Sequence, residues 1–168
     1  MARVALVSGG TRGIGAAVSV ALQEQGRIVI ANFASNEAAA AAFHEQTGIR
    51  TAKFDVCSFE ECVKAVQQIT EDVGPIEVLV NNAGITRDGT LQRMSRDMWD
   101  AVIDTNLGSC FNLCKLTFPD MRDRRFMPLL RHGGGELRGR FPSVLPDLDR
   151  PLDVRRHQLE SSPGKGHR

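Results

Sequence analysis

The chain of 168 residues contains no tyrosine, one tryptophan and almost no excess of either charge. Its formal net charge is +1 and its isoelectric point is near 7.7, so charge gives no reason to expect nucleic acid or an anionic membrane as a partner. No apolar run approaches the length of a membrane span, and the first residues lack the pattern of a cleaved leader peptide. We therefore expect a cytoplasmic protein that does not bind a membrane.

The four cysteines fall in two pairs, Cys57 with Cys62 and Cys110 with Cys114. Zinc sites usually combine two-residue gaps between cysteines with histidine or further cysteine nearby, and neither pair has this arrangement. We expect no metal site. The cysteines are interpreted instead as reduced thiols that pack as small, buried apolar groups in a reducing compartment.

The most informative segment that is present is a glycine-rich turn near the N-terminus. An apolar run, Val4–Val7, leads into residues 8–15, Ser-Gly-Gly-Thr-Arg-Gly-Ile-Gly, and then into an alanine-rich helical pattern. Gly9, Gly13 and Gly15 carry no Cβ, so the backbone can approach an anion, and the N–H groups of the following helix point at a phosphate. This pattern favours a dinucleotide site. Its spacing differs from G-x-G-x-x-G, so an ordinary tight strand-to-helix turn is the alternative.

Strand and helix patterns alternate up to about residue 126. Strands are predicted at residues 4–7, 28–31, 51–56 and 76–80, and helices at 14–25, 37–46, 59–73 and 96–115. Apolar strands separated by helices of this length form a parallel sheet that is covered on both faces. Right-handed crossovers then give a doubly wound, Rossmann-type α/β fold.

Two of the helices begin with clear capping signals. Ser58 and Glu61 form a capping box, in which the serine caps the helix and the glutamate reaches back. Ser95 is expected to cap the long last helix. Apolar residues recur along that helix near helical spacing and are predicted to pack in the core: Met98, Trp99, Val102, Ile103, Leu107, Phe111, and Leu113 or Cys114.

Polar residues follow two of the predicted strands. Residues 81–84, Asn-Asn-Ala-Gly, come directly after the fourth strand, at the edge where open α/β sheets bind ligands. The two amides can tie neighbouring strands or bind a ribose, although Asn and Gly also favour plain turns. Asp55, at the end of the third strand, either accepts a hydrogen bond from an adenine amino group or caps the next helix.

The second strand ends at residues 31–33, Ala-Asn-Phe, without an Asp or Glu to bind a ribose 2′-hydroxyl. Arg12 lies in the glycine loop, where a guanidinium can pair with a 2′-phosphate. We therefore expect NADP as the cofactor, with NADPH preferred over NADH. The alternative is that Arg12 is a solvated loop charge.

Several segments of residues 1–126, taken together and in their order along the chain, resemble the short-chain dehydrogenase/reductase family. The residues that carry the resemblance are 8–15, Asp55, Val56, 81–84, 85–88, Trp99, Asn106 and Lys115. Within the family they are most similar to bacterial acetoacetyl-CoA reductases and 3-oxoacyl-carrier-protein reductases. The resemblance implies hydride transfer from a nicotinamide cofactor to a 3-oxoacyl thioester, in a family whose members are usually homotetramers.

The resemblance also implies roles for single residues. The backbone around Thr11, Arg12 and Ile14 would bind the pyrophosphate and the 2′-phosphate. The other implied contacts are Asp55 and Val56 beside the adenine, and Asn82, Ala83 and Gly84 along the adenosine ribose. Asn106 would hold a water molecule in a proton relay.

The sequence departs from the family after Phe126. Catalysis in the family depends on a serine and a Tyr-x-x-x-Lys pair beyond a fifth strand, because the tyrosine gives a proton to the carbonyl and the lysine lowers its pKa. This chain has no tyrosine. Its later candidates stand at no matching spacing and receive no role: Ser143, Ser161, Ser162 and Lys165. We expect the chain as written to be inactive, as a truncated product or one with a shifted reading frame.

Residues 127–168 contain five of the seven prolines, seven arginines and three consecutive glycines. They show no helical or strand period and are predicted to form an irregular or disordered tail, so residues 1–126 are the predicted NADP-binding domain. A basic RNA-binding tail is the alternative, but the arginines are scattered among aspartates without aromatic partners. The chain is then a reductase by family, a nucleotide-binding fragment without catalysis, or a fragment that does not fold.

Overall fold

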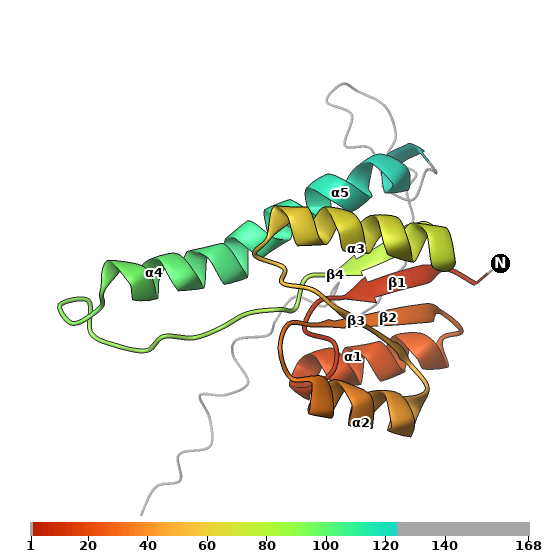
Figure 1. The fold of residues 1–168 in the computed structure, drawn as a ribbon, viewed down its shortest axis with the longest axis horizontal. Coiled ribbons are helices and arrows are strands. Elements are labelled where there is room, and N and C mark those ends of the chain that lie inside the picture. The colour runs from red at the N-terminus through yellow and green to blue at the C-terminus, as the bar shows by residue number, and fades with distance from the viewer. Residues whose placement is uncertain (1, 124–168) are drawn as a thin grey trace, which may run out of the picture. The chain divides into compact units, whose positions relative to one another are not determined.

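The computed structural model describes residues 2–123, and the predicted tail at residues 127–168 lies outside the described part. Strands and helices alternate along the chain (Figure 1). The elements are β1 (Val4–Val7), α1 (Gly13–Glu24), β2 (Ile28–Phe33), α2 (Glu37–Thr47), β3 (Arg50–Lys53), α3 (Phe59–Asp72), β4 (Ile76–Val80), α4 (Arg96–Ile103), the π-helical turn η1 (Asp104–Gly108) and α5 (Ser109–Asp123).

The four strands form one parallel sheet in the order β3-β2-β1-β4. Helices α1 and α2 cover one face, and α3 and α5 cover the other (Figure 1). Each face has its own core, with Leu22 and Phe43 in one and Cys62, Leu113 and Met121 in the other. The predicted doubly wound α/β sheet is confirmed.

β4 is an edge strand within residues 2–123, because β1 is its only partner there. Its neighbour β1 is completely enclosed, with Ala5, Leu6 and Val7 at 0% exposure. The centre of the sheet is therefore buried, whereas β4 is paired with a neighbouring strand along one edge only within the described residues.

Local signals set most of the helix ends. Asn36, Ser58 and Ser95 each accept a hydrogen bond from a backbone N–H three residues later, at 2.9, 3.3 and 3.2 Å. The capping box differs from its prediction in one respect. Glu61 reaches back to the N–H of Asp55, over 2.8 Å, and not to that of Ser58, because the chain turns before α3 and brings Asp55 closer.

The third strand is shorter than predicted and ends at Lys53, not at Val56. Phe54 still donates to the carbonyl of Phe33, over 3.1 Å, and the chain then turns. The turn is held by Asp55, whose Oδ1 accepts from the N–H of Cys57 over 2.9 Å and whose carbonyl accepts from the N–H of Ser58 over 3.1 Å. Asp55 therefore lies in the loop beyond the strand.

The last helix is longer than predicted and is interrupted. It continues to Asp123 through Pro119, and the π-helical turn η1 separates α4 from α5. The predicted core role of its apolar residues is correct for Leu113, which is fully buried. It is wrong for four others, whose exposed fractions are 49%, 37%, 64% and 62%: Trp99, Ile103, Leu107 and Phe111.

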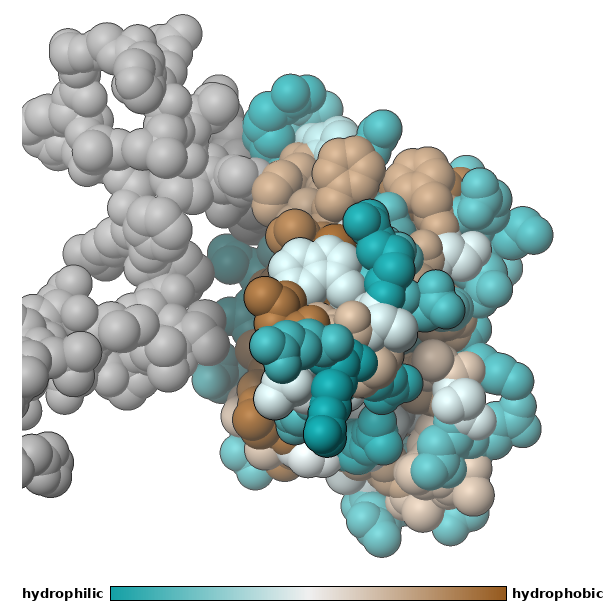
Figure 2. All heavy atoms as spheres, turned by 90° about the vertical axis from the view of Figure 1, so that its left-hand side faces the viewer, coloured by the Kyte–Doolittle hydropathy of each residue, from teal (hydrophilic) through white to brown (hydrophobic). Residues whose placement is uncertain are grey.

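For Trp99 and Ile103 the reason is the position of α4, which extends beyond the end of the sheet (Figure 1) and has no buried residue. Figure 2 views that side and shows apolar side chains at the surface between charged ones. The helical period identified an apolar face, but it could not say what covers it.

The cysteines only partly match the expectation of buried thiols. Cys62 is completely buried, and its burial raises the pKa of the thiol to about 11. Cys57 is exposed, and Cys110 and Cys114 are half-buried. Within residues 2–123, no group of three His, Cys, Asp or Glu side chains is placed to hold a metal ion, and no helix is long and apolar enough to cross a membrane.

Candidate functional site

The glycine loop joins β1 to α1 at the carboxyl edge of the sheet. Gly9 and Gly13 have φ angles of +61° and +53°, which side chains with a Cβ rarely adopt. The N–H of Gly10 donates to the carbonyl of Asn32 over 2.9 Å, and Ser19 Oγ donates to the carbonyl of Gly10 over 3.0 Å. The first contact holds the loop against the end of β2, and the second holds it against α1.

The N-terminus of α1 lacks the features that occupy the other helix starts. Arg12 stands at its N-cap position and makes no side-chain cap, and the first turn has no acidic residue. α2, α3 and α4 each have a capping side chain and an acidic residue in the first turn. The first N–H groups of α1 thus have no capping partner, and the space above Gly13 is open, because a Cβ there would meet no atom within 4 Å. An anion fits this position.

Gly15 brings the first turn of α1 close to two other segments. A Cβ at this position would collide with the carbonyl oxygen of Gly9 and lie 2.5 Å from Asn82 Nδ2. Gly15 therefore permits an approach between the glycine loop and residues 81–84 that no other residue allows.

Ser8 and Asn82 join the glycine loop to the loop after β4. Ser8 Oγ accepts from the N–H groups of Asn82 and Ala83, over 2.9 and 3.0 Å. Asn82 Nδ2 donates in return to the carbonyls of Ser8 and Gly9, over 3.0 and 3.2 Å. The second of the two adjacent asparagines therefore ties two strand ends together.

Asn32 is a functional candidate that the sequence reasoning missed. Its side chain is buried, accepts from the N–H of Gly9 over 3.2 Å and donates to the carbonyl of Phe54 over 2.9 Å. It links the glycine loop to the loop after β3. A single amide within an otherwise apolar strand was the signal that could have revealed it, because a buried polar group needs partners.

Asn106 lies in the π-helical turn and holds the segment that follows residues 81–84. Its Oδ1 accepts from the N–H of Ile85 over 2.8 Å, and its Nδ2 donates to the carbonyl of Ile85 over 3.1 Å. A Cβ at Gly84 would lie 3.2 Å from Asn106 Oδ1, so this segment passes close to the helix. The side-chain amide is thus paired with backbone on both sides.

The sequence of the chain matches the family model for short chain dehydrogenases over residues 3–126. The chain belongs to the short-chain dehydrogenase family. The resemblance predicted from the sequence is confirmed.

This short-chain dehydrogenase is similar in sequence to three curated relatives. It is 52% identical to the acetoacetyl-CoA reductases of Paracoccus denitrificans and Shinella zoogloeoides over 126 residues, which are 75% of this chain and 52% of each relative. It is 41% identical to the 3-oxoacyl-[acyl-carrier-protein] reductase of Chlamydia trachomatis over 124 residues, which are 71% of this chain and 50% of that relative. The chain spans about half the length of the curated relatives it matches.

In this short-chain dehydrogenase the other predicted site residues lie around the same edge. Asp55 is exposed and does not cap α3, since Ser58 does, so that alternative for Asp55 is wrong. Val56 is buried, and its carbonyl accepts from Asn112 Nδ2 over 3.0 Å, which fastens α5 to this loop. Ile14 is 78% exposed at the start of α1.

Proposed function

We propose that residues 1–126 form an NADP-binding domain whose phosphate site is the glycine loop and the N-terminus of α1. The proposal depends mainly on one observation: the N-terminus of α1 has no side-chain cap, and the space next to Gly13 is open. Backbone N–H groups around Thr11 and Ile14 would bind the pyrophosphate. Both the open space and the close approach at Gly15 fit a dinucleotide that lies across these loops.

The remaining contacts are proposed from their place at the same edge. Asp55 and Val56 would flank the adenine, and Asn82, Ala83 and Gly84 would line the adenosine ribose. Arg12 is exposed and makes no ion pair with any residue in the described range 2–123, so its guanidinium is free to meet a 2′-phosphate. This supports NADPH over NADH.

The reaction class follows from the relatives, which are named as reductases of acetoacetyl-CoA and of 3-oxoacyl-[acyl-carrier-protein]. When bound, the nicotinamide would supply a hydride to the 3-oxo carbonyl of such a thioester. A protein residue must then donate a proton, and the 168-residue sequence has no tyrosine to do so. Asn106 cannot replace it, because an amide has no acidic proton at neutral pH and its Nδ2 is already engaged by Ile85.

We therefore propose a cytoplasmic chain of the 3-oxoacyl-thioester reductase type that binds NADP and does not turn over substrate by itself. Residues 127–168 are proposed to lie outside the nucleotide-binding domain. The homotetramer of the family would bury the apolar face of α4, where Trp99 and Ile103 are exposed.

Replacing Gly13 with valine is expected to weaken NADPH binding about 10- to 100-fold, because the Cβ enters the space of the phosphate and charge-assisted hydrogen bonds are lost. Isothermal titration calorimetry measures the change. Gly26→Val is a matched control at the other end of α1, since Gly26 also has a positive φ, +78°, and open space. Both variants lose about 1–2 kcal/mol of stability from backbone strain, but only Gly13→Val loses binding. Equal NADPH affinity in the two variants would exclude this loop as the phosphate site.

Replacing Arg12 with aspartate is expected to reduce NADPH affinity about 10- to 100-fold and NADH affinity much less, because a partner of the 2′-phosphate becomes a repelling charge. Arg50→Asp is the control, because Arg50 is exposed and begins β3 at the opposite edge of the sheet. Titrations with both nucleotides measure the ratio. Similar losses for NADPH and NADH would make Arg12 a pyrophosphate contact or a structural residue.

A further inference from the structure

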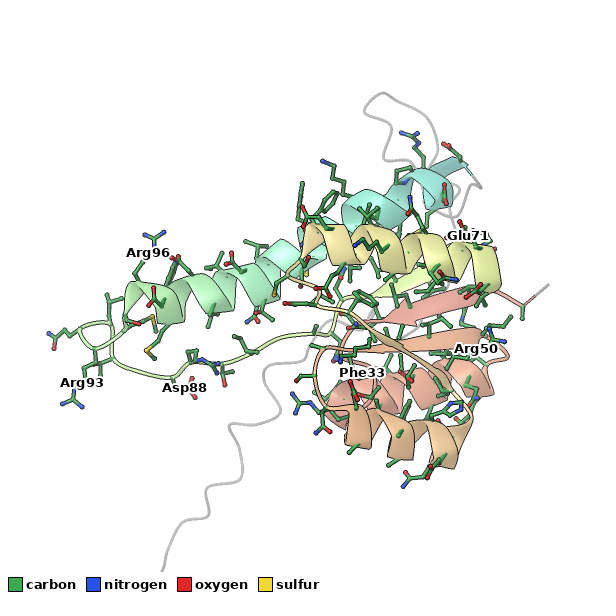
Figure 3. The ribbon with its side chains drawn as sticks, in the orientation of Figure 1. Phe33, Arg50, Glu71, Asp88, Arg93 and Arg96 are labelled. Atoms are coloured by element: carbon green, nitrogen blue, oxygen red, sulfur yellow. The ribbon has the colours of Figure 1, made fainter. Side chains whose placement is uncertain are left out.

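An ion pair lies at the carboxyl edge of the sheet, next to the end of β2. Lys53 Nζ donates to Glu37 Oε1 over 2.5 Å, and their side chains are 55% and 68% exposed. Lys53 is the last residue of β3 and is paired in register with Phe33, the last residue of β2. Figure 3 shows Phe33 at this edge and Arg50 at the opposite one.

Glu37 is the first acidic residue after β2. It lies in the first turn of α2, directly after the N-cap residue Asn36. In dinucleotide-binding folds, the group that meets the 2′ substituent of the adenosine ribose lies near the end of this strand. Asn32 does not serve there, because its side chain is turned inward to Gly9 and Phe54.

We infer that the Lys53–Glu37 ion pair contributes to the discrimination between NADPH and NADH, because Lys53 neutralises a carboxylate that would otherwise repel the 2′-phosphate. This inference rests on the proposed nucleotide site. A 2′-phosphate carries up to two negative charges, whereas the 2′-hydroxyl of NADH carries none, so the charge of Glu37 opposes NADPH more strongly than NADH.

Protonation cannot replace the lysine in this role. The Lys53 ammonium beside Glu37 holds the pKa of that carboxyl below its usual range. A glutamate with its ordinary pKa is also ionised at neutral pH, so the carboxylate is charged with or without this shift, and Lys53 is the group that masks it. Because the pair is exposed, its influence on the phosphate depends on ionic strength.

The test compares Lys53→Met, Glu37→Gln and the double variant in the full chain by calorimetric titration with NADPH and with NADH. At about 10 mM salt, where screening is weak, Lys53→Met is expected to weaken NADPH binding about fivefold and to leave NADH binding within about twofold. Glu37→Gln is expected to strengthen NADPH binding about threefold, because Lys53 then attracts the phosphate. The double variant returns the NADPH-to-NADH ratio to that of the unmodified chain, and about 0.5 M salt removes most of each effect.

Lys64→Met and Glu45→Gln are matched controls, because both residues are exposed and carry the same charges on α3 and on the later part of α2. They are expected to leave the NADPH-to-NADH ratio unchanged, and thermal melts confirm that all variants fold. An unchanged ratio in Lys53→Met, or equal loss of both nucleotides, overturns the role of the ion pair and leaves the nucleotide site intact. If the unmodified chain binds neither nucleotide, the proposed function itself fails.

Discussion

A Gly15→Ala variant is expected to lose about 3 kcal/mol of stability together with nucleotide binding, although alanine is the better helix former. The added Cβ would collide with the carbonyl of Gly9 and crowd Asn82 Nδ2. Neither group can move freely, since Gly9 is bonded to Asn32 and Asn82 to Ser8. Thermal and denaturant unfolding measure the stability, and calorimetry with NADPH measures the binding.

Gly108→Ala is the matched control for that change. Gly108 is also helical, but a Cβ there would lie 3.8 Å from the carbonyl oxygen of Ile103, an ordinary contact. The control is expected to be neutral or to gain up to about 1 kcal/mol from helix propensity. If Gly15→Ala were as stable as the control and bound NADPH equally well, the close approach between the two loops would have no role.

The second large effect concerns catalysis by the chain as written. Its rate of acetoacetyl-CoA reduction with NADPH is expected to equal the background, because general acid catalysis typically contributes about 10²- to 10⁴-fold and the sequence has no tyrosine. Oxidation of NADPH followed by its absorbance measures the rate. Restoring a family-like reading frame after residue 126 is expected to recover both turnover and a cooperative melt.

Two observations separate the explanations of that loss. Translation of the encoding DNA in the other two frames beyond residue 126 should reveal a strand followed by Tyr-x-x-x-Lys, and its absence from both frames would reject the frameshift hypothesis. Turnover well above background by the 168-residue chain would overturn the proposal, and a residue that received no role, such as Lys165, would become a candidate proton donor.

The parts of the fold that were predicted correctly depend on local chemistry. The strand Val4–Val7 is apolar at every position, and α2 begins at Glu37 as predicted, because Asn36 caps it. The end of β3 was misplaced because the apolar residues Phe54 and Val56, which follow the strand, are buried as strand residues would be. The hydrophobic pattern therefore extends past Lys53, where the strand ends.

The site was harder to predict, because its contacts join residues far apart in the chain. The sequence identified Gly15 and Asn82 separately, but only the folded chain shows that they nearly touch. In the sequence, Asn32 was noted only because an Asp or Glu is absent at the end of the second strand. Its hydrogen bonds to the glycine loop and to the loop after β3 depend on the pairing of three strands, which the sequence does not show. The π-helical turn that carries Asn106 follows no local sequence rule used in the prediction.

The one-sided pairing of β4 has a consequence for the chain while it is being synthesised. Half of the backbone N–H and C=O groups of β4 point away from β1, along an edge that residues 2–123 leave without a partner strand. Once the first 80 residues have emerged from a ribosome, this edge can pair with an extended segment. That segment can come from later in the same chain or from another nascent chain nearby. The order in which strands arrive then decides between a continued sheet and an aggregate.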